Sequence, residues 1–230
     1  QAFGLHPVVF AVVADAAARS HAVVHAAVLG IPAAFYSGIE QALRLLPAAT
    51  AEADRTPQRE AFLAALNGVL GDHLLATGNP LALAARLRMA NRALVLERAA
   101  LAASHPDAGS RLLVMVHGLC MNDLQWQQGG HHHGNRLADE LGFEVIHLHY
   151  NSGLSIAANG REFSALLQQL ADAWPVPIER IAIIAHSMGG LVSRAAIASA
   201  QADGSAWLAR LDALACLGTP HLGAPLERAG

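Results

Sequence analysis

The segment Arg180-Ile181-Ala182-Ile183-Ile184-Ala185-His186-Ser187-Met188-Gly189-Gly190 decides how the second half of the chain folds. Its apolar first half predicts a buried strand, and the small residues that follow indicate a sharp turn from strand to helix. Such a turn strains the backbone of its central serine and tolerates only small residues two positions to either side, here Ala185 and Gly189. This relaxed form of G-x-S-x-G favours Ser187 as a nucleophile for acyl transfer. The alternative is an ordinary N-cap serine followed by flexible glycines.

A second apolar run, over residues 111–116, ends in His117-Gly118 and predicts another strand. Serine hydrolysis passes through a tetrahedral oxyanion, which needs pre-positioned backbone N–H donors. One donor comes from the residue after the nucleophile, here Met188, and the other from the loop after an earlier strand. Gly118 lets this loop approach the substrate closely, so we expect the Leu119 N–H to be the second donor. The alternative is a strand that simply ends at a glycine turn.

Three motifs, in this order along the chain, resemble the successive signatures of bacterial α/β-hydrolase esterases and lipases, including relatives of the GPI inositol-deacylase type. They are His117-Gly118-Leu119-Cys120, Ala185-His186-Ser187-Met188-Gly189-Gly190-Leu191-Val192 and Leu217-Gly218-Thr219-Pro220-His221-Leu222-Gly223-Ala224-Pro225. The resemblance covers residues 111–230 and implies a serine ester hydrolase that acts through an acyl-enzyme on Ser187. It does not imply an acyl chain length or a head group, because one such fold hosts many chemistries.

The partners of the nucleophile follow it in this family in the order serine, acid, histidine. Only His221 and Glu227 follow Ser187 in the right general direction, and His221 lies in a motif that the resemblance marks as a loop-shaping element near the site. The chain begins at Gln1 without an initiator methionine and stops at Gly230. We therefore expect an incomplete chain whose acid and histidine lie beyond its C-terminus. Because a serine without its base is a poor nucleophile, we expect this chain alone to hydrolyse esters very slowly.

Strands and helices alternate after the polar segment 104–110, which predicts an α/β fold with a mostly parallel sheet and helices on both faces. The expected strands cover residues 111–117, 143–150, 180–185 and 213–217, and the expected helices 134–141, 157–173 and 188–200. The carboxyl ends of parallel strands meet at one edge of a sheet. We expect that edge to carry His117, Tyr150, Ser187 and Thr219. Tyr150 and Trp126 either line an acyl pocket or belong to ordinary packing.

The first part of the chain is Ala-rich with helical spacing over residues 8–30 and 33–46. Thr56-Pro57 begins a further helix, with Phe62, Leu66, Val69 and Leu70 expected on its buried face. Residues 81–97 fit an antiparallel hairpin that turns at Asn91-Arg92, or a helix. We expect residues 1–80 to form a helical N-terminal region and residues 81–230 the hydrolase core, its last strands missing. Residues 20–39 carry no charge, but polar and helix-breaking residues favour a packed or membrane-lying helix over a membrane span.

Composition limits the partners of this 230-residue chain. A net charge of −3 argues against nucleic acid, which binds basic surfaces. Hydrophobic residues make up 53% and charged residues 14%, which fits a largely buried parallel sheet and a protein that works beside lipid. We expect a small-molecule or lipid ester as substrate, peripheral contact with a membrane, and a cytoplasmic or membrane-peripheral location. Two cysteines, Cys120 and Cys216, are too few for a disulfide framework.

Several histidines suggest a metal site, but their spacing along the sequence does not favour one. His131-His132-His133 has no companion cysteine or carboxylate cluster at ligand spacing, so we expect no metal and no cofactor. His147 and His149 share one face of a strand, as core or loop-edge residues also do. His186 precedes the nucleophile on the opposite strand face, so we expect it to pack beneath the turn. The alternative function is a non-catalytic scaffold of hydrolase fold, or a membrane-peripheral interaction module.

Overall fold

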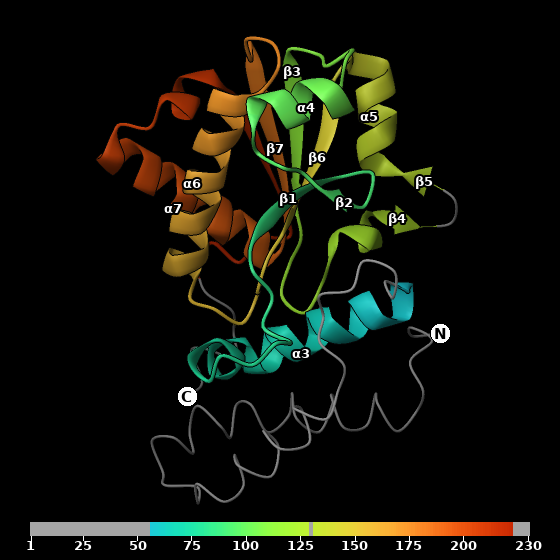
Figure 1. Cartoon of the computed structure of the whole chain (residues 1–230). Helices are drawn as coiled ribbons and strands as arrows, with labels where there is room; N and C mark the ends of the chain where they lie inside the picture. Colours follow the sequence, from blue (N-terminus) through green and yellow to red (C-terminus); the bar gives the residue numbers. More distant parts are fainter. Residues whose placement is uncertain (1–55, 129–130, 223–230) are drawn as a thin grey trace, which may run out of the picture. The chain divides into compact units, whose positions relative to one another are not determined.

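The computed structural model describes residues 56–128 and 131–222 (Figure 1). These residues belong to two compact units, one holding residues up to 83 together with 151–154, the other residues 84–150 together with 155–222. The helices expected over residues 8–30 and 33–46, and the uncharged stretch 20–39, lie outside the described residues. Within the described ranges, no helix has both the length and the apolar character needed to cross a membrane.

The second unit is built on a six-stranded sheet in the order β2-β1-β6-β3-β7-β8. Strands β6, β3, β7 and β8 run parallel, whereas β1 pairs antiparallel with both β2 and β6. This mostly parallel sheet confirms the expected fold class. The strands are β1 (Arg86–Met89), β2 (Arg92–Ala93), β3 (Arg111–Val116), β6 (Glu144–His149), β7 (Arg180–His186) and β8 (Leu211–Leu217).

Of the two alternatives for residues 81–97, the structure shows the hairpin. The turn was expected at Asn91-Arg92 but lies one residue earlier, because Arg92 pairs with Met89 as part of β2. Ala90 and Asn91 form it with φ of 46° and 64°, the left-handed backbone that two-residue hairpin turns require. Pairing between β1 and β6 extends the sheet on this side, with Leu87 opposite Leu148. Because alanine, leucine and arginine are good helix formers, only this long-range pairing decides between strand and helix.

Helices cover both faces of the sheet, with α6 and α7 on one side and α5 on the other (Figure 1). A Ser155 side chain caps α6, accepting a hydrogen bond from the Ala158 N–H at 3.1 Å. The remaining elements of this unit are α4 (Arg98–Ser104), α5 (His133–Leu141), α6 (Ile156–Ala173), α7 (Met188–Asp203), the 3₁₀ helices η2 (Asp123–Trp126) and η3 (Ala206–Arg210), and the short strands β4 (Gln127–Gln128) and β5 (His131–His132).

Burial falls from the middle of the sheet toward β8. Leu112 to Val116 in β3 are all buried, as expected of a parallel strand covered on both faces. In β7, burial alternates: Ile181, Ile183 and Ala185 are buried, and the residues between them are half-buried. Strand β8 has no fully buried residue. The apolar run before Ser187 is therefore a strand buried mainly on one face, that of the α6–α7 core, which includes Phe163, Trp174 and Trp207.

The first unit contains helix α3 (Pro57–Ala76), which Thr56 caps and Pro57 begins, as the sequence predicts. Its buried face matches the expected one only in part. Leu66 is buried, and Phe62 and Leu70 are half-buried against the same cluster. Leu63, Asn67 and Leu74 are buried as well, whereas Val69 is only half-buried. The Asn67 side chain explains the difference. It donates to the Leu81 carbonyl at 2.8 Å and accepts from the Leu83 N–H at 2.9 Å, so the returning chain lies on that side of the helix.

The contact between α6 and α7 predicts an unusual response to a glycine substitution. In an open helix Gly→Ala stabilises by about 1 kcal/mol. A Cβ at Gly160 would instead overlap Ala195 of α7, so we expect Gly160→Ala to destabilise the protein by about 1–3 kcal/mol. Urea unfolding measures this, and adding Ala195→Gly should recover part of the loss. If Gly160→Ala stabilised the protein, as Gly→Ala does in an open helix, this result would contradict the close packing.

Candidate functional site

Ser187 lies between the last residue of β7 and the first residue of α7. Its backbone has φ 51° and ψ −125°, a conformation that a residue with a side chain rarely adopts. Hydrogen bonds hold this geometry from both sides. The Ser187 N–H donates to the Leu217 carbonyl of β8 at 2.8 Å, and the Ser187 carbonyl accepts from the Gly190 N–H at 3.1 Å. A strained turn persists only where its surroundings fix it in this way.

The glycines after Ser187 are required by close packing. A Cβ at Gly189 would lie 2.7 Å from the Val116 carbonyl oxygen, at the end of β3. A Cβ at Gly190 would overlap the side chain of Thr219, which follows β8. The first turn of α7 therefore lies directly against the ends of both neighbouring strands.

The loop after β3 runs beside Ser187. A Cβ on Gly118 would lie only 3.0 Å from the Cβ of Ser187, so the Gly118 backbone lies next to the serine. Leu119 follows directly and its side chain is 49% exposed. Met188 opens α7, whose N-terminal amides carry the partial positive charge of the helix dipole. The structure thus brings Ser187, Gly118 and Met188 together at one edge of the sheet.

His117 and Tyr150 support this loop from within the protein. The His117 Nδ1–H donates to the Gly118 carbonyl at 2.9 Å, and the His117 ring stacks on Tyr150 with centroids 4.4 Å apart. The Tyr150 hydroxyl donates to the His117 carbonyl at 2.8 Å. Because the Gly118–Leu119 peptide is trans, fixing its carbonyl toward His117 turns the Leu119 N–H to the opposite side. Tyr150 is buried and packs within this support.

Burial decides the charge state of these two side chains. It lowers the pKa of His117 to about 3, despite the hydrogen bond to the Gly118 carbonyl that favours the protonated ring. His117 is therefore neutral at neutral pH and keeps its proton on Nδ1, where the carbonyl accepts it. Burial also raises the pKa of the Tyr150 hydroxyl, which stays protonated and can donate. The loop support does not change its protonation between weakly acidic and weakly basic pH.

No histidine or carboxylate among the described residues forms a hydrogen bond with the Ser187 hydroxyl. His221 is exposed, and its Nδ1 accepts from the Arg194 guanidinium at 3.0 Å. The ring of His186 lies near Trp126, and a Cβ on Gly118 would come within 3.3 Å of its Nδ1, so His186 borders the same loop. Glu227 lies outside the described residues.

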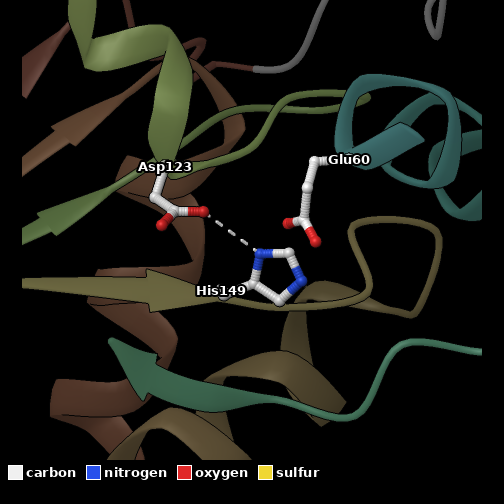
Figure 2. A group of neighbouring side chains, drawn as sticks. All are labelled: Glu60, Asp123 and His149. Carbon is white, nitrogen blue, oxygen red and sulfur yellow. Dashed lines mark hydrogen bonds and ion pairs between the residues drawn. The ribbon is translucent and has the colours of Figure 1, made fainter. Parts of the chain in front are cut away.

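A buried ion pair that the sequence did not reveal lies behind the loop. The Asp123 carboxylate accepts from the Arg88 guanidinium at 2.8 Å, and His149 Nδ1 lies 3.3 Å from the same oxygen (Figure 2). Burial raises the pKa of Asp123, but the His149 hydrogen bond and the Arg88 charge outweigh it and bring the pKa to about 2. Because the guanidinium occupies this place, Asp123 and His149 are poorly suited to bind a cation there.

Comparison with known proteins gives one family and two solved structures. Residues 106–230 match the model of the family described as "Putative serine esterase (DUF676)". The lipase BlEst2 of Bacillus licheniformis in its mature form is 21% identical with a TM-score of 0.42, covering 54% of this chain and 46% of that one. The propeptide form is 17% identical with a TM-score of 0.43, covering 62% and 27%. The chain thus spans less than half the length of these structures. No curated protein matched.

Burial of neutral His117 predicts a loss of stability in acid. The unfolded chain binds a proton at this histidine below its ordinary pKa of 6.5, whereas the folded protein does so only near pH 3. The contribution of His117 to the free energy of unfolding is therefore complete above pH 6.5. It falls as the pH drops, by about 2 kcal/mol near pH 5. Urea unfolding near pH 7.5 and near pH 5 measures it.

His117→Phe should reduce this pH dependence by about 2 kcal/mol, whereas His133→Phe at an exposed position should not change it. Equal pH dependence in the wild type and in His117→Phe would contradict a neutral buried ring.

Proposed function

The chain belongs to the serine esterase family that its residues 106–230 match, and on this premise we propose that it is a carboxylic-ester hydrolase, an esterase or lipase, with Ser187 as its nucleophile. The observation that carries the proposal is the backbone of Ser187, strained at φ 51° and held by β8 and α7 beside the Gly118 backbone. A serine hydroxyl at such a nucleophile elbow stands clear of the sheet, where a base and a substrate carbonyl can both reach it.

In this mechanism the Ser187 Oγ attacks the ester carbonyl carbon and passes its proton to a base. The carbonyl oxygen becomes an oxyanion, which the N–H groups of Leu119 and Met188 stabilise as an oxyanion hole. Collapse of the tetrahedral intermediate breaks the ester C–O bond, the leaving oxygen takes the proton back from the base and departs as the neutral alcohol, and an acyl-enzyme remains. Water then attacks the acyl group, and the acid leaves as Ser187 regains its proton.

Neither the base nor its carboxylate partner is proposed from the described residues. The His221 ring accepts from Arg194, and His117 is neutral with its Nδ1 proton committed to the Gly118 carbonyl. We therefore place both groups outside residues 56–128 and 131–222. Without a base beside it, the Ser187 hydroxyl remains a weak nucleophile, so turnover depends on a hydrogen bond between Ser187 and that base.

Exposed apolar residues near the strand ends support an apolar ester as substrate. Leu119, Leu217 and Leu222 are 49%, 46% and 83% exposed, although they are large hydrophobic residues. All three follow or end strands at the edge that carries Ser187. Exposed apolar side chains at this edge are suited to an acyl chain or to the surface of a lipid aggregate.

Covalent labelling tests the nucleophile directly. A fluorophosphonate should phosphonylate the Ser187 Oγ with loss of fluoride, and intact-mass spectrometry of the full-length protein would show the adduct. Ser187→Ala should abolish labelling, whereas Ser199→Ala, on the exposed side of α7, should leave it unchanged. Labelling that persists in Ser187→Ala would sink this assignment. A folded full-length protein that takes no label would favour the non-catalytic scaffold.

Crowding the loop tests the oxyanion hole. Gly118→Ala would place a methyl group 3.0 Å from the Ser187 Cβ and 3.3 Å from the His186 Nδ1, so the loop and the serine must separate by a few tenths of an ångström. We expect hydrolysis of a p-nitrophenyl ester by the full-length protein to slow roughly 100-fold or more, the effect of losing one oxyanion donor. Gly109→Ala, which meets the flexible Glu144 side chain, should keep its rate. Equal rates for the two variants would rule out the loop as donor.

A further inference from the structure

The chain leaves β6 through a short loop, residues 151–154, that belongs to the first unit together with α3. Tyr150 directly precedes this loop, belongs to the second unit, and donates its hydroxyl to the His117 carbonyl. One peptide bond therefore joins the support of the loop beside Ser187 to the unit that contains α3. The family match begins at residue 106, so α3 lies outside the part of the chain that resembles serine esterases.

The side chain of Asn151 attaches this loop to α3. Its Nδ2–H donates to the Gly71 carbonyl at 3.0 Å, and its Oδ1 accepts from the Gly153 N–H at 3.1 Å. Asn151 is 1% exposed. Because a buried amide that loses its hydrogen-bond partners is costly, these bonds hold the side chain in one place.

The backbones of the loop and of α3 also lie in close contact. A Cβ on Gly153 would overlap the Asn67 carbonyl oxygen of α3, and a Cβ on Gly71 would overlap the Asn151 side chain. Asn67 and Gly71 are four residues apart, so they lie on the same face of the helix. A glycine on each side thus allows the loop and the helix to pack backbone against backbone.

The same face of α3 holds the chain that leads into β1. Asn67 bonds to the backbone of Leu81 and Leu83, shortly before that strand begins. Strand β1 then pairs antiparallel with β6, with Arg86 opposite His149. The chain that enters β1 and the chain that leaves β6 are therefore both attached to one face of α3.

We propose that α3 is a positioning element for the oxyanion hole and acts through Asn151 and Tyr150. This inference rests on the proposed function of Ser187. Tyr150 is 2% exposed and stacks on the His117 ring, and close-packed interiors transmit small displacements. A shift of Asn151 therefore reaches the Tyr150 hydroxyl and the His117 carbonyl that it holds, and so the Leu119 N–H. A displacement of about 1 Å in such geometry can slow a reaction by about 100-fold.

Hydrolysis of a p-nitrophenyl ester by the full-length protein tests the coupling. Gly71→Ala displaces the Asn151 side chain from α3, and Asn151→Ser removes the donor to the Gly71 carbonyl without adding bulk. We expect each variant to lower kcat roughly fivefold or more and to leave KM nearly unchanged, because the oxyanion exists only in the transition state and the intermediates. Leu75→Ala, at an exposed position of α3, should keep both constants.

Tyr150→Phe tests the route, because it removes the hydroxyl through which α3 would act. In the Tyr150→Phe background, Gly71→Ala should lower kcat little further, since two changes along one route are not additive. A full additional loss in the double variant would overturn the proposed route. Unchanged kcat in both Gly71→Ala and Asn151→Ser, whatever their melting temperatures, would show that α3 is merely structural.

An NMR measurement keeps this inference separate from the esterase proposal. In a Ser187→Ala background, which cannot turn over ester, Gly71→Ala should shift the Leu119 amide resonance and Leu75→Ala should not. If the shift appears but the protein with Ser187 hydrolyses no ester, the proposed function fails and the positioning of the loop by α3 stands. If the ester is hydrolysed but neither Gly71→Ala nor Asn151→Ser shifts the resonance, the positioning role fails.

Discussion

The parallel alignment of β3, β7 and β8 is the constraint on which the rest of the site depends. Because these strands run in the same direction, their carboxyl ends meet at one edge, and the residues that follow them come together there. The register of the strands brings these ends to the same level. Val116 lies opposite Ala185 and His186 opposite Leu217, so the loop after β3, the turn at Ser187 and the end of β8 fall at one level.

Backbone groups do most of the positioning in this site. The loop beside Ser187 takes its shape from the carbonyls of His117 and Gly118, which the Tyr150 hydroxyl and the His117 ring hold respectively. Both donors are buried and neutral as they act, so their hydrogen bonds are shielded from water. The support is thus built from side chains that take no part in the proposed reaction, whereas the groups proposed to hold the oxyanion are main-chain amides.

Sequence reasoning predicted those features that follow from local spacing. The strand ends, the turn at Ser187 and the capped start of α3 at Thr56 each depend on residues a few positions apart. The structure has the turn and the cap at the expected places, and each of the four parallel strands ends at or next to its expected last residue. Features that depend on distant residues were not predictable. Arg88 pairs with Asp123 across 35 positions, and Asn67 binds the backbone of Leu81 and Leu83, which adds Asn67 to the buried face of α3.

Strand β8 is the last strand on its side of the described sheet, and none of its residues is fully buried. Its Leu217 carbonyl nevertheless holds the Ser187 amide. Hydrogen exchange at the Ser187 amide requires this bond to open, so its rate reports on the attachment of β8 to the turn that follows β7. The strained backbone of Ser187 therefore depends on a neighbouring strand that is itself only partly buried.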